Sequence, residues 1–118
     1  MTELLVVDDD PMMLRMLAAA LRGGPWRATL VSDAQEAIRL ARTQRWDGLI
    51  TDLDLPGGDG LDLAGLVRQA DPGIPVAVIT AVNDPPPAGG PGGPDLVLRK
   101  PLDRQALLDF LKARLGER

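Results

Sequence analysis

The chain has 118 residues, which is enough for one domain with a single hydrophobic core. It contains no cysteine and no histidine, which excludes disulfides, thiol chemistry, zinc–thiolate sites and histidine-based catalysis. Its net charge of -4 argues against general nucleic-acid binding, and no apolar run is long enough to cross a membrane.

Short apolar runs alternate with segments of helical periodicity, which predicts an α/β fold with a parallel sheet and crossover helices. The first run, residues 3–7, precedes Asp10 as a helix N-cap and Pro11 as the first helical residue. We expect this helix to stop at Gly23. Its predicted apolar stripe consists of Leu14, Leu17, Ala18 and Leu21.

The middle of the chain repeats this alternation. A strand over residues 27–31 is followed by a helix over 34–43, for which Asp33 and Glu36 form an N-terminal capping signature. Residues 48–51 are typical of a buried central strand. Asp59 opens the next helix, which is predicted to run to about residue 70. Its expected inward residues are Leu63, Leu66, Val67 and Ala70.

The last two predicted strands, residues 75–79 and 95–98, are separated by an unusual segment. Nine of the thirteen residues 83–95 are proline or glycine, and such a composition does not form a helix. We therefore expect a Pro/Gly-rich loop where a crossover helix belongs. Asp103 then caps a final helix that ends near Leu115.

Side chains that can bind ions or take part in a reaction stand at the ends of four of these runs. Asp8 and Asp9 follow the first run, Asp52 the third, Thr80 the fourth and Lys100 the fifth. Because the carboxyl ends of parallel strands share one edge, where open α/β sheets bind ligands, we expect these side chains to converge. Clustered carboxylates repel one another unless a hard cation lies between them, and such oxygen ligands suit Mg²⁺.

The same residues suit phosphoryl transfer. A carboxylate such as Asp52 can attack a phosphoryl group to give an aspartyl phosphate, and the reaction depends mainly on positioning and charge neutralisation. Lys100 offers a point charge and Thr80 a hydrogen-bond donor, although a strand-end hydroxyl bound to backbone is the alternative for Thr80. A tight turn directly after a strand also makes the Lys100–Pro101 bond a candidate for the cis form.

Four motifs occur in a characteristic order: Val6-Val7-Asp8-Asp9, Asp52-Leu53-Asp54-Leu55-Pro56-Gly57-Gly58-Asp59-Gly60, Ile79-Thr80-Ala81 and Lys100-Pro101. With this order and spacing, the chain resembles the receiver domains of bacterial two-component response regulators over essentially its whole length. The resemblance implies one receiver domain, residues 1–118, with a doubly wound, flavodoxin-like sheet of strand order 2-1-3-4-5.

The resemblance also implies roles for the site residues. Asp52 would be the phosphoacceptor, and it would hold Mg²⁺ or Mn²⁺ together with Asp8, Asp9 and the backbone carbonyl of Asp54. The side chains of Asp54 and Val82 fall where the family sets the lifetime of the phosphorylated state.

In the same family pattern, Thr80, followed by Ala81, would be the switch hydroxyl that turns toward the phosphoryl group. Lys100, followed by a cis Pro101, would pair with a phosphoryl oxygen.

The implied phosphodonor is a histidine kinase or a phosphotransfer protein that carries a phosphohistidine. Phosphorylation would switch binding to an output partner, an attached effector domain or a second copy of the chain. The domain would catalyse only its own phosphorylation and dephosphorylation, so we do not expect an enzyme with a separate substrate. The N-terminus lacks a signal peptide, so we expect a cytoplasmic protein without direct membrane or nucleic-acid contacts.

Two departures from the family pattern concern signal output. The Pro/Gly-rich loop stands where the family has a helix of its signalling and dimerisation face, and Val97 stands where the family usually has an aromatic residue. The coupled threonine–aromatic rotation therefore cannot operate as such. We hypothesise that phosphorylation changes the order or position of residues 83–95, and that apolar sheet surface bared near the last strands contacts a partner.

Three other interpretations remain open at this point. The Asp52-Leu53-Asp54 motif also resembles the nucleophile motif of haloacid-dehalogenase-type phosphatases, but the chain leaves no room for a substrate cap. A Toprim-like nucleic-acid module would have a glutamate after the first strand, where this chain has aspartates. A receiver-like module that binds partners without phosphorylation would not need the complete set of acids, threonine and lysine.

Overall fold

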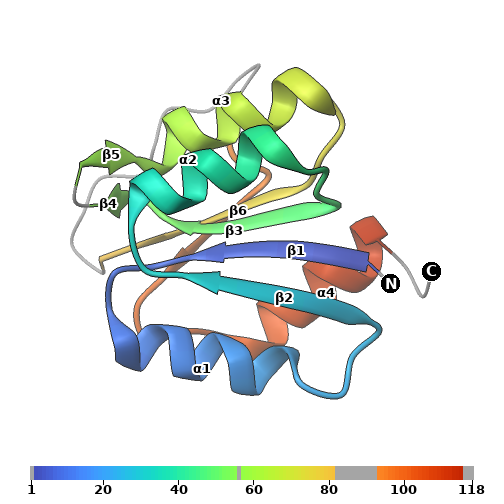
Figure 1. Cartoon of the computed structure of the whole chain (residues 1–118). Helices are drawn as coiled ribbons and strands as arrows, with labels where there is room; N and C mark the ends of the chain where they lie inside the picture. The colour runs from blue at the N-terminus through green and yellow to red at the C-terminus, as the bar shows by residue number, and fades with distance from the viewer. Residues whose placement is uncertain (1, 56, 82–92, 116–118) are drawn as a thin grey trace.

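The computed structural model describes residues 2–55, 57–81 and 93–115. Five parallel strands form the main sheet in the order β2-β1-β3-β6-β7, which confirms the predicted doubly wound topology. Their bounds are β1 Thr2–Val7, β2 Trp26–Val31, β3 Gly48–Asp52, β6 Val76–Thr80 and β7 Leu96–Arg99. Each neighbouring pair in this sheet is parallel, as the arrows of β1 and β2 show in Figure 1, so the carboxyl ends of the strands share one edge.

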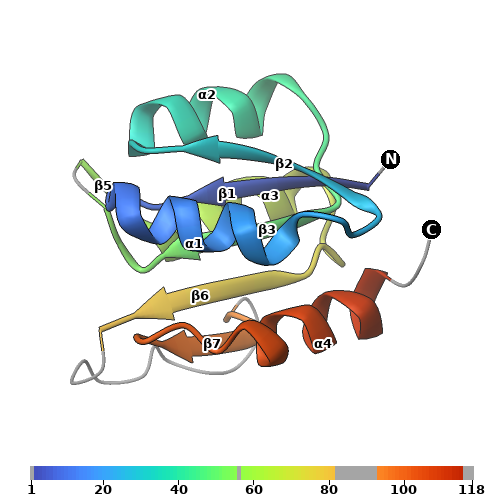
Figure 2. The same ribbon diagram turned by 90° about the horizontal axis from the view of Figure 1, so that it is seen from below.

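Within the described residues, four helices cover the sheet, two on each face (Figure 1). They are α1 Pro11–Leu21, α2 Ala34–Thr43, α3 Gly60–Ala70 and α4 Arg104–Leu115. Helices α2 and α3 pack on one face, and α1 and α4 pack on the other. Figure 2 shows β2 and β7 at the two edges of the sheet, with α4 beside β7.

Two hydrophobic clusters, one on each face, hold these layers together. Alternate residues of β1 enter opposite clusters, since Leu5 and Val7 pack under α2 and α3 while Leu4 and Val6 pack against α1 and α4. Every residue of β3 and β6 is buried, as expected for central strands covered on both faces. The residues at the carboxyl ends of β3 and β6 therefore follow strands that are buried along their whole length.

The predicted stripe of α1 is rotated from the observed one. Its buried residues are Met13, Leu17, Ala20 and Leu21. Leu17 and Leu21 were predicted correctly, but Leu14 and Ala18 are only half-buried. The buried stripe is centred on Leu17, and the long side chain of Met13 reaches the sheet from the first turn.

The predicted face of α3 is wrong at its end. The buried residues of this helix are Gly60, Leu63, Ala64 and Val67, whereas Leu66 is half-buried and Ala70 is exposed. The small residues Gly60 and Ala64 let the first turns approach the sheet closely. Ala70 lies on nearly the same helix face as the buried Leu63, but it is the last residue of the helix and is exposed there.

The helix caps occur where the sequence predicted them. The Asp10 carboxylate accepts a hydrogen bond from the Met12 N–H at 2.9 Å, and Asp33 accepts one from Glu36 at 2.8 Å. Asp59 caps α3 through the Leu61 N–H at 2.7 Å, and Asp103 accepts from Ala106 at 3.0 Å. Each cap satisfies an N–H group that would otherwise lack a partner.

The sequence did not predict a small antiparallel hairpin after β3. It consists of β4 Asp54–Leu55 and β5 Gly58–Asp59. The predicted Pro/Gly-rich loop cannot be judged, because Val82 and the rest of residues 82–92 lie outside the described residues.

Asp95, just before β7, joins four elements at the amino end of the sheet. Its carboxylate accepts a hydrogen bond from the Val76 N–H at 2.8 Å and pairs with Arg68 of α3 at 3.1 Å and Arg114 of α4 at 3.2 Å. Partial burial acts to raise the pKa of Asp95, but the Val76 N–H and the two guanidinium groups together lower it. We call Asp95, Arg68 and Arg114 the Asp95 clamp.

None of the helices in the described ranges combines the length and hydropathy that a membrane crossing requires.

Candidate functional site

Asp8, Asp9 and Asp52 form an acidic cluster at the carboxyl edge of the sheet. Val7 of β1 pairs with Thr51 of β3, so the next residues of both strands, Asp8 and Asp52, emerge side by side. One carboxylate oxygen from each of the three acids lies within 4.8 Å of the others. Asp8 is 0 % exposed and Asp52 is 7 % exposed, whereas Asp9 faces solvent. The predicted convergence of these acids is therefore confirmed.

The environment of the cluster disfavours two adjacent negative charges. Burial raises the pKa of Asp8 to about 6, against the opposing hydrogen bond from the Asp10 N–H and with a smaller contribution from the neighbouring Asp52 carboxylate. Burial also raises the pKa of Asp52, against the opposing effects of the Asp54 N–H and Lys100. An added cation would favour the ionised form of both groups.

Lys100 forms an ion pair with the phosphoacceptor candidate Asp52. Its Nζ lies 3.8 Å from Oδ2 of Asp52, and the Lys100–Pro101 peptide bond is cis, as predicted. The other oxygen of Asp52, Oδ1, accepts a hydrogen bond of 3.2 Å from the Asp54 N–H. The Asp52 carboxylate is thus held from both sides, by a lysine of the β7 end and by the loop that follows its own strand.

The acidic cluster fits a hard divalent cation. Oδ2 of Asp8 is buried and has no hydrogen-bond partner among the described residues, although Oδ1 accepts from the Asp10 N–H at 2.9 Å. Burying a carboxylate oxygen without a hydrogen-bond donor costs folding free energy, and coordination to a metal ion is one way to satisfy that oxygen. Three carboxylates with no nitrogen or sulfur ligand select Mg²⁺ or Mn²⁺ over softer metals.

Thr80, at the end of β6, is 1 % exposed. Its hydroxyl donates to the carbonyl oxygen of Ala81 at 3.3 Å. In this structure Thr80 therefore makes a strand-end hydrogen bond to backbone, which the sequence analysis gave as the alternative to a role in phosphoryl transfer. Val97, at the usual aromatic position, is half-buried on β7. The roles of Ala81 and Val97 as switch positions remain predictions, as does that of Asp54 in setting the lifetime.

The loop between β3 and α3 is held to the sheet by backbone contacts that the sequence did not reveal. The Leu53 N–H donates to the carbonyl of Ile79 at 2.9 Å, and the Gly60 N–H donates to the carbonyl of Leu53 at 2.8 Å. A Cβ on Gly60 would clash with the carbonyl oxygen of Asp52 and would lie 3.1 Å from Cγ2 of Thr51. The glycine after an N-cap aspartate was the available signal for this close approach.

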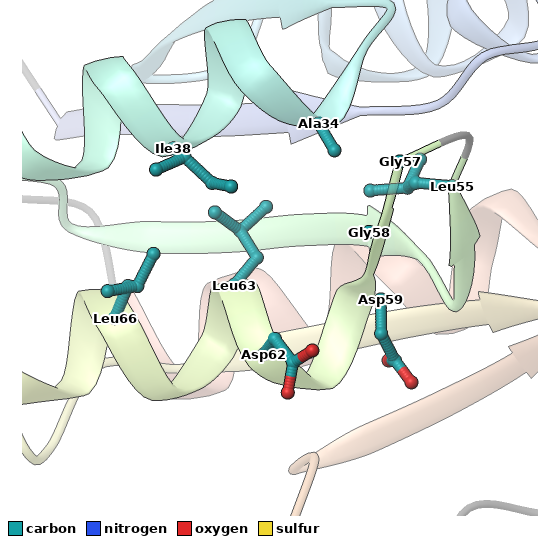
Figure 3. Close-up of a pocket in the computed structure, with 9 residues that line it drawn as sticks. All are labelled: Ala34, Ile38, Leu55, Gly57, Gly58, Asp59, Asp62, Leu63 and Leu66. Carbon is teal, nitrogen blue, oxygen red and sulfur yellow. The ribbon is translucent and has the colours of Figure 1, made fainter.

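An apolar cavity of about 120 Å³ lies between α2, α3 and the β4–β5 hairpin (Figure 3). The side chains of Ile38, Leu63 and Leu66 point toward one another there, and the hairpin forms one end. No residue of the acidic cluster lines this cavity. It is therefore separate from the acidic site at the sheet edge.

Comparison with known sequences matches this chain to one family. The family model described as "Response regulator receiver domain" matches residues 4–112. A probable transcriptional regulatory protein TcrX of Mycobacterium tuberculosis is 37% identical over 94% of this chain and 48% of its own length. The DNA-binding response regulator MtrA of Mycolicibacterium smegmatis is 36% identical over 95% of this chain and 50% of its own. The chain thus spans about half the length of these curated relatives.

Solved structures agree with this match. A putative response regulator from Chloroflexus aurantiacus superposes with a TM-score of 0.85 at 34% identity and covers 98% of both chains. The receiver domain of the sensor histidine kinase PA1611 from Pseudomonas aeruginosa gives a TM-score of 0.82 at 30% identity, again over 98% of both chains. Its structure has a magnesium ion coordinated in the active site cleft. These matches favour neither the phosphatase nor the Toprim interpretation.

Proposed function

Because this chain belongs to the family of response regulator receiver domains of two-component systems, we propose that its Asp52 accepts a phosphoryl group from a phosphohistidine donor. The observation that carries the proposal is the position of the Asp52 carboxylate. It lies at the end of a buried central strand, beside Asp8 and Asp9, with Lys100 Nζ 3.8 Å away. This arrangement joins a nucleophile to a cation-binding group and a fixed positive charge.

A divalent cation is part of this proposal. Asp8, Asp9, Asp52 and the backbone carbonyl of Asp54 would hold Mg²⁺ or Mn²⁺, and the orphaned Oδ2 of Asp8 supports that assignment. When bound, the cation neutralises negative charge on the carboxylates and on the incoming phosphoryl group.

Several residues of the chain have separate roles in phosphoryl transfer. An oxygen of Asp52 forms a bond to phosphorus as the phosphorus–nitrogen bond of the donor breaks, and the donor imidazole, protonated on its other nitrogen, leaves neutral. Lys100 pairs with a phosphoryl oxygen in place of the Asp52 oxygen that it now faces. The Thr80 hydroxyl turns from the Ala81 carbonyl to donate to another phosphoryl oxygen. Asp54 and Val82 set the lifetime of the product.

The donor is a histidine kinase or phosphotransfer protein, and we place its contact on the first two turns of α1. Met12 and Met16 stand there one turn apart, 60% and 38% exposed, although neither is needed by the core. Helix α1 begins directly after the acidic residues that follow β1, so these methionines belong to the element next to the acidic cluster. Exposed methionines suit a surface that accepts a partner.

The output is a change in partner binding. The named relatives are transcriptional and DNA-binding regulators about twice the length of this chain, so an attached effector domain is one candidate and a separate partner or a second copy is another. The domain acts only on its own phosphorylation state. A bacterial cytoplasmic location belongs to the same proposal.

Intact-mass measurement tests the proposal. The protein is incubated with acetyl phosphate and Mg²⁺, in parallel with a chelator control and with Asp52→Asn. We expect the parent to gain the mass of one phosphoryl group and both controls to gain none. Asp54→Asn, which keeps the backbone carbonyl, should still gain one. No gain in the parent would refute the proposal and would favour a module that binds partners without phosphorylation.

A further inference from the structure

Thr80 and Arg99 donate to the same carbonyl oxygen. Oγ1 of Thr80 lies 3.3 Å from the carbonyl oxygen of Ala81, and Nη1 of Arg99 lies 3.4 Å from the same atom. The two residues are direct neighbours across the parallel pair β6–β7, the strands that run side by side in Figure 2. The sequence analysis gave Arg99 no role.

The pleat of the sheet places both side chains on one face. Val78 belongs to the cluster beneath α2 and α3, and alternate residues of a strand face the same way, so Thr80 also points to that side. Arg99 is in register with Thr80, and Val97 is in register with Val78. Arg99 therefore stands on the same face as Val97, one alternation nearer to the phosphoacceptor edge.

We propose that Arg99 is a positioning residue for Thr80: it keeps the Ala81 carbonyl hydrogen-bonded and so frees the Thr80 hydroxyl to turn toward the phosphoryl group. This inference rests on the proposed function, because it concerns the step in which Thr80 leaves its present partner.

The Thr80 hydroxyl carries a single hydrogen. Thr80 cannot donate to Ala81 and to a phosphoryl oxygen at the same time. Ala81 is exposed, so without Arg99 its carbonyl would depend on an ordered water when Thr80 turns away, and ordering a water costs entropy that a donor already in place does not. The Arg99 guanidinium carries several N–H groups and already reaches the same oxygen.

The lengths of the two contacts suit an exchange. Distances of 3.3 and 3.4 Å lie beyond the optimum for hydrogen bonds that involve a hydroxyl or an N–H donor. Both contacts have room to shorten, so the Arg99 bond to this oxygen can strengthen as Thr80 leaves. Arg99 is half-buried and lies on the same strand as Val97, which stands where the family usually has an aromatic residue. A shift of the Arg99 side chain would therefore change the surface of β7 near that position.

A double-mutant cycle tests the inference. Arg99→Met keeps the length of the side chain and removes its donors, Thr80→Ala removes the hydroxyl, and the double variant closes the cycle. The measured quantity is the rate of phosphorylation by acetyl phosphate at saturating Mg²⁺. We expect Arg99→Met to slow the parent by about threefold to tenfold, but to change the Thr80→Ala background by less than about twofold. Arg99→Lys should recover part of the loss.

Two further readouts separate positioning from general damage. Arg99→Met should leave the Mg²⁺ affinity unchanged, since Arg99 is not part of the acidic cluster, and thermal unfolding should show that every variant is folded. In the absence of a phosphodonor, the same substitution should shift the NMR signals of the Ala81 carbonyl carbon and the Thr80 methyl group.

The outcomes distinguish this inference from the proposed function. Equal slowing by Arg99→Met in both backgrounds would mean that Arg99 acts through its charge alone, which overturns the inference while the proposed function stands. No slowing in the parent background overturns it as well. If the parent takes up no phosphoryl group on Asp52, the proposed function is refuted, and the inference that rests on it is refuted as well.

Discussion

Gly60 lies against the carbonyl oxygen of Asp52, at a distance that leaves no room for a side-chain carbon. The first residue of α3 and the last residue of β3 are therefore in direct backbone contact. This contact fixes the loop that carries Asp54, whose N–H donates to the Asp52 carboxylate. The orientation of the phosphoacceptor candidate thus depends on a glycine eight residues further along the chain.

Gly60→Ala should destabilise the domain by about 1–3 kcal/mol, since the new methyl group must push the Asp52 carbonyl or α3 aside. It should also weaken Mg²⁺ binding, because the displaced backbone carries Asp52 and Asp54. Chemical denaturation and magnesium titration check these two effects.

Gly65→Ala is the matched control on the same helix. Nothing lies within 4 Å of a Cβ at Gly65, so alanine there should stabilise the domain by about 0.5–1 kcal/mol through its higher helix propensity. If both substitutions have the same effect, the close contact at Gly60 is not what makes the glycine necessary.

Asp8→Asn should stabilise the metal-free domain and abolish its stabilisation by Mg²⁺. The substitution removes a charge from a fully buried position next to Asp52, and at pH 7 the gain should be about 1–3 kcal/mol. Thermal unfolding with and without Mg²⁺ measures both effects. Asp9→Asn is the control: Asp9 is exposed, so this variant should lose Mg²⁺ affinity without a comparable gain in stability.

The stabilising effect of Asp8→Asn should depend on pH in one direction. The carboxyl pKa of Asp8 is about 6 in the folded domain and near 3.8 when unperturbed, so the folded state holds a proton that the unfolded chain releases. Ionisation of Asp8 therefore lowers the free energy of unfolding as pH rises through this window. The stability difference between variant and parent should grow from about pH 4 to about pH 6 and stay constant above it. A difference that shrinks over this range would contradict the assignment.

Asp95→Ala should lower the free energy of unfolding by about 1–3 kcal/mol, because the Val76 N–H loses its side-chain acceptor and Arg68 and Arg114 each lose one ionic partner. Asp95→Asn, which keeps an acceptor for Val76, should cost less. Denaturant unfolding measures both changes. Glu36→Gln, on the exposed pair with Arg39, is the control, and no measurable change is expected. A loss for Asp95→Ala no larger than for this control would show that the Asp95 clamp contributes nothing.

Much of the architecture follows from local patterns in the sequence. Apolar runs, N-cap aspartates and the order of elements predicted the parallel sheet and four helices, and the shared strand edge predicted the meeting of Asp8, Asp9 and Asp52. These features depend on neighbours within a few residues or on topology alone, so a single sequence carries them.

Features that depend on close packing were not predicted. The rotation of α1 that buries Met13 instead of Leu14 arises from how the helix lies on the sheet. The orphaned oxygen of Asp8 and the shared acceptor of Thr80 and Arg99 depend on distances between strands that are far apart in the sequence. Residues 82–92 lie outside the described ranges, so the predicted departure from the family pattern there and the two hypotheses about that segment remain predictions.

Locating the phosphoryl group is the most direct test of the account. The domain is phosphorylated with acetyl phosphate and Mg²⁺, the acyl phosphate is reduced with borohydride, and the modified residue is identified by peptide mass spectrometry as homoserine. We predict conversion at Asp52 in the parent and in Asp54→Asn, and none in Asp52→Asn. Conversion at Asp8, Asp9 or Asp54 in the parent, or at none of the acids, would contradict the assignment of Asp52 as the phosphoacceptor.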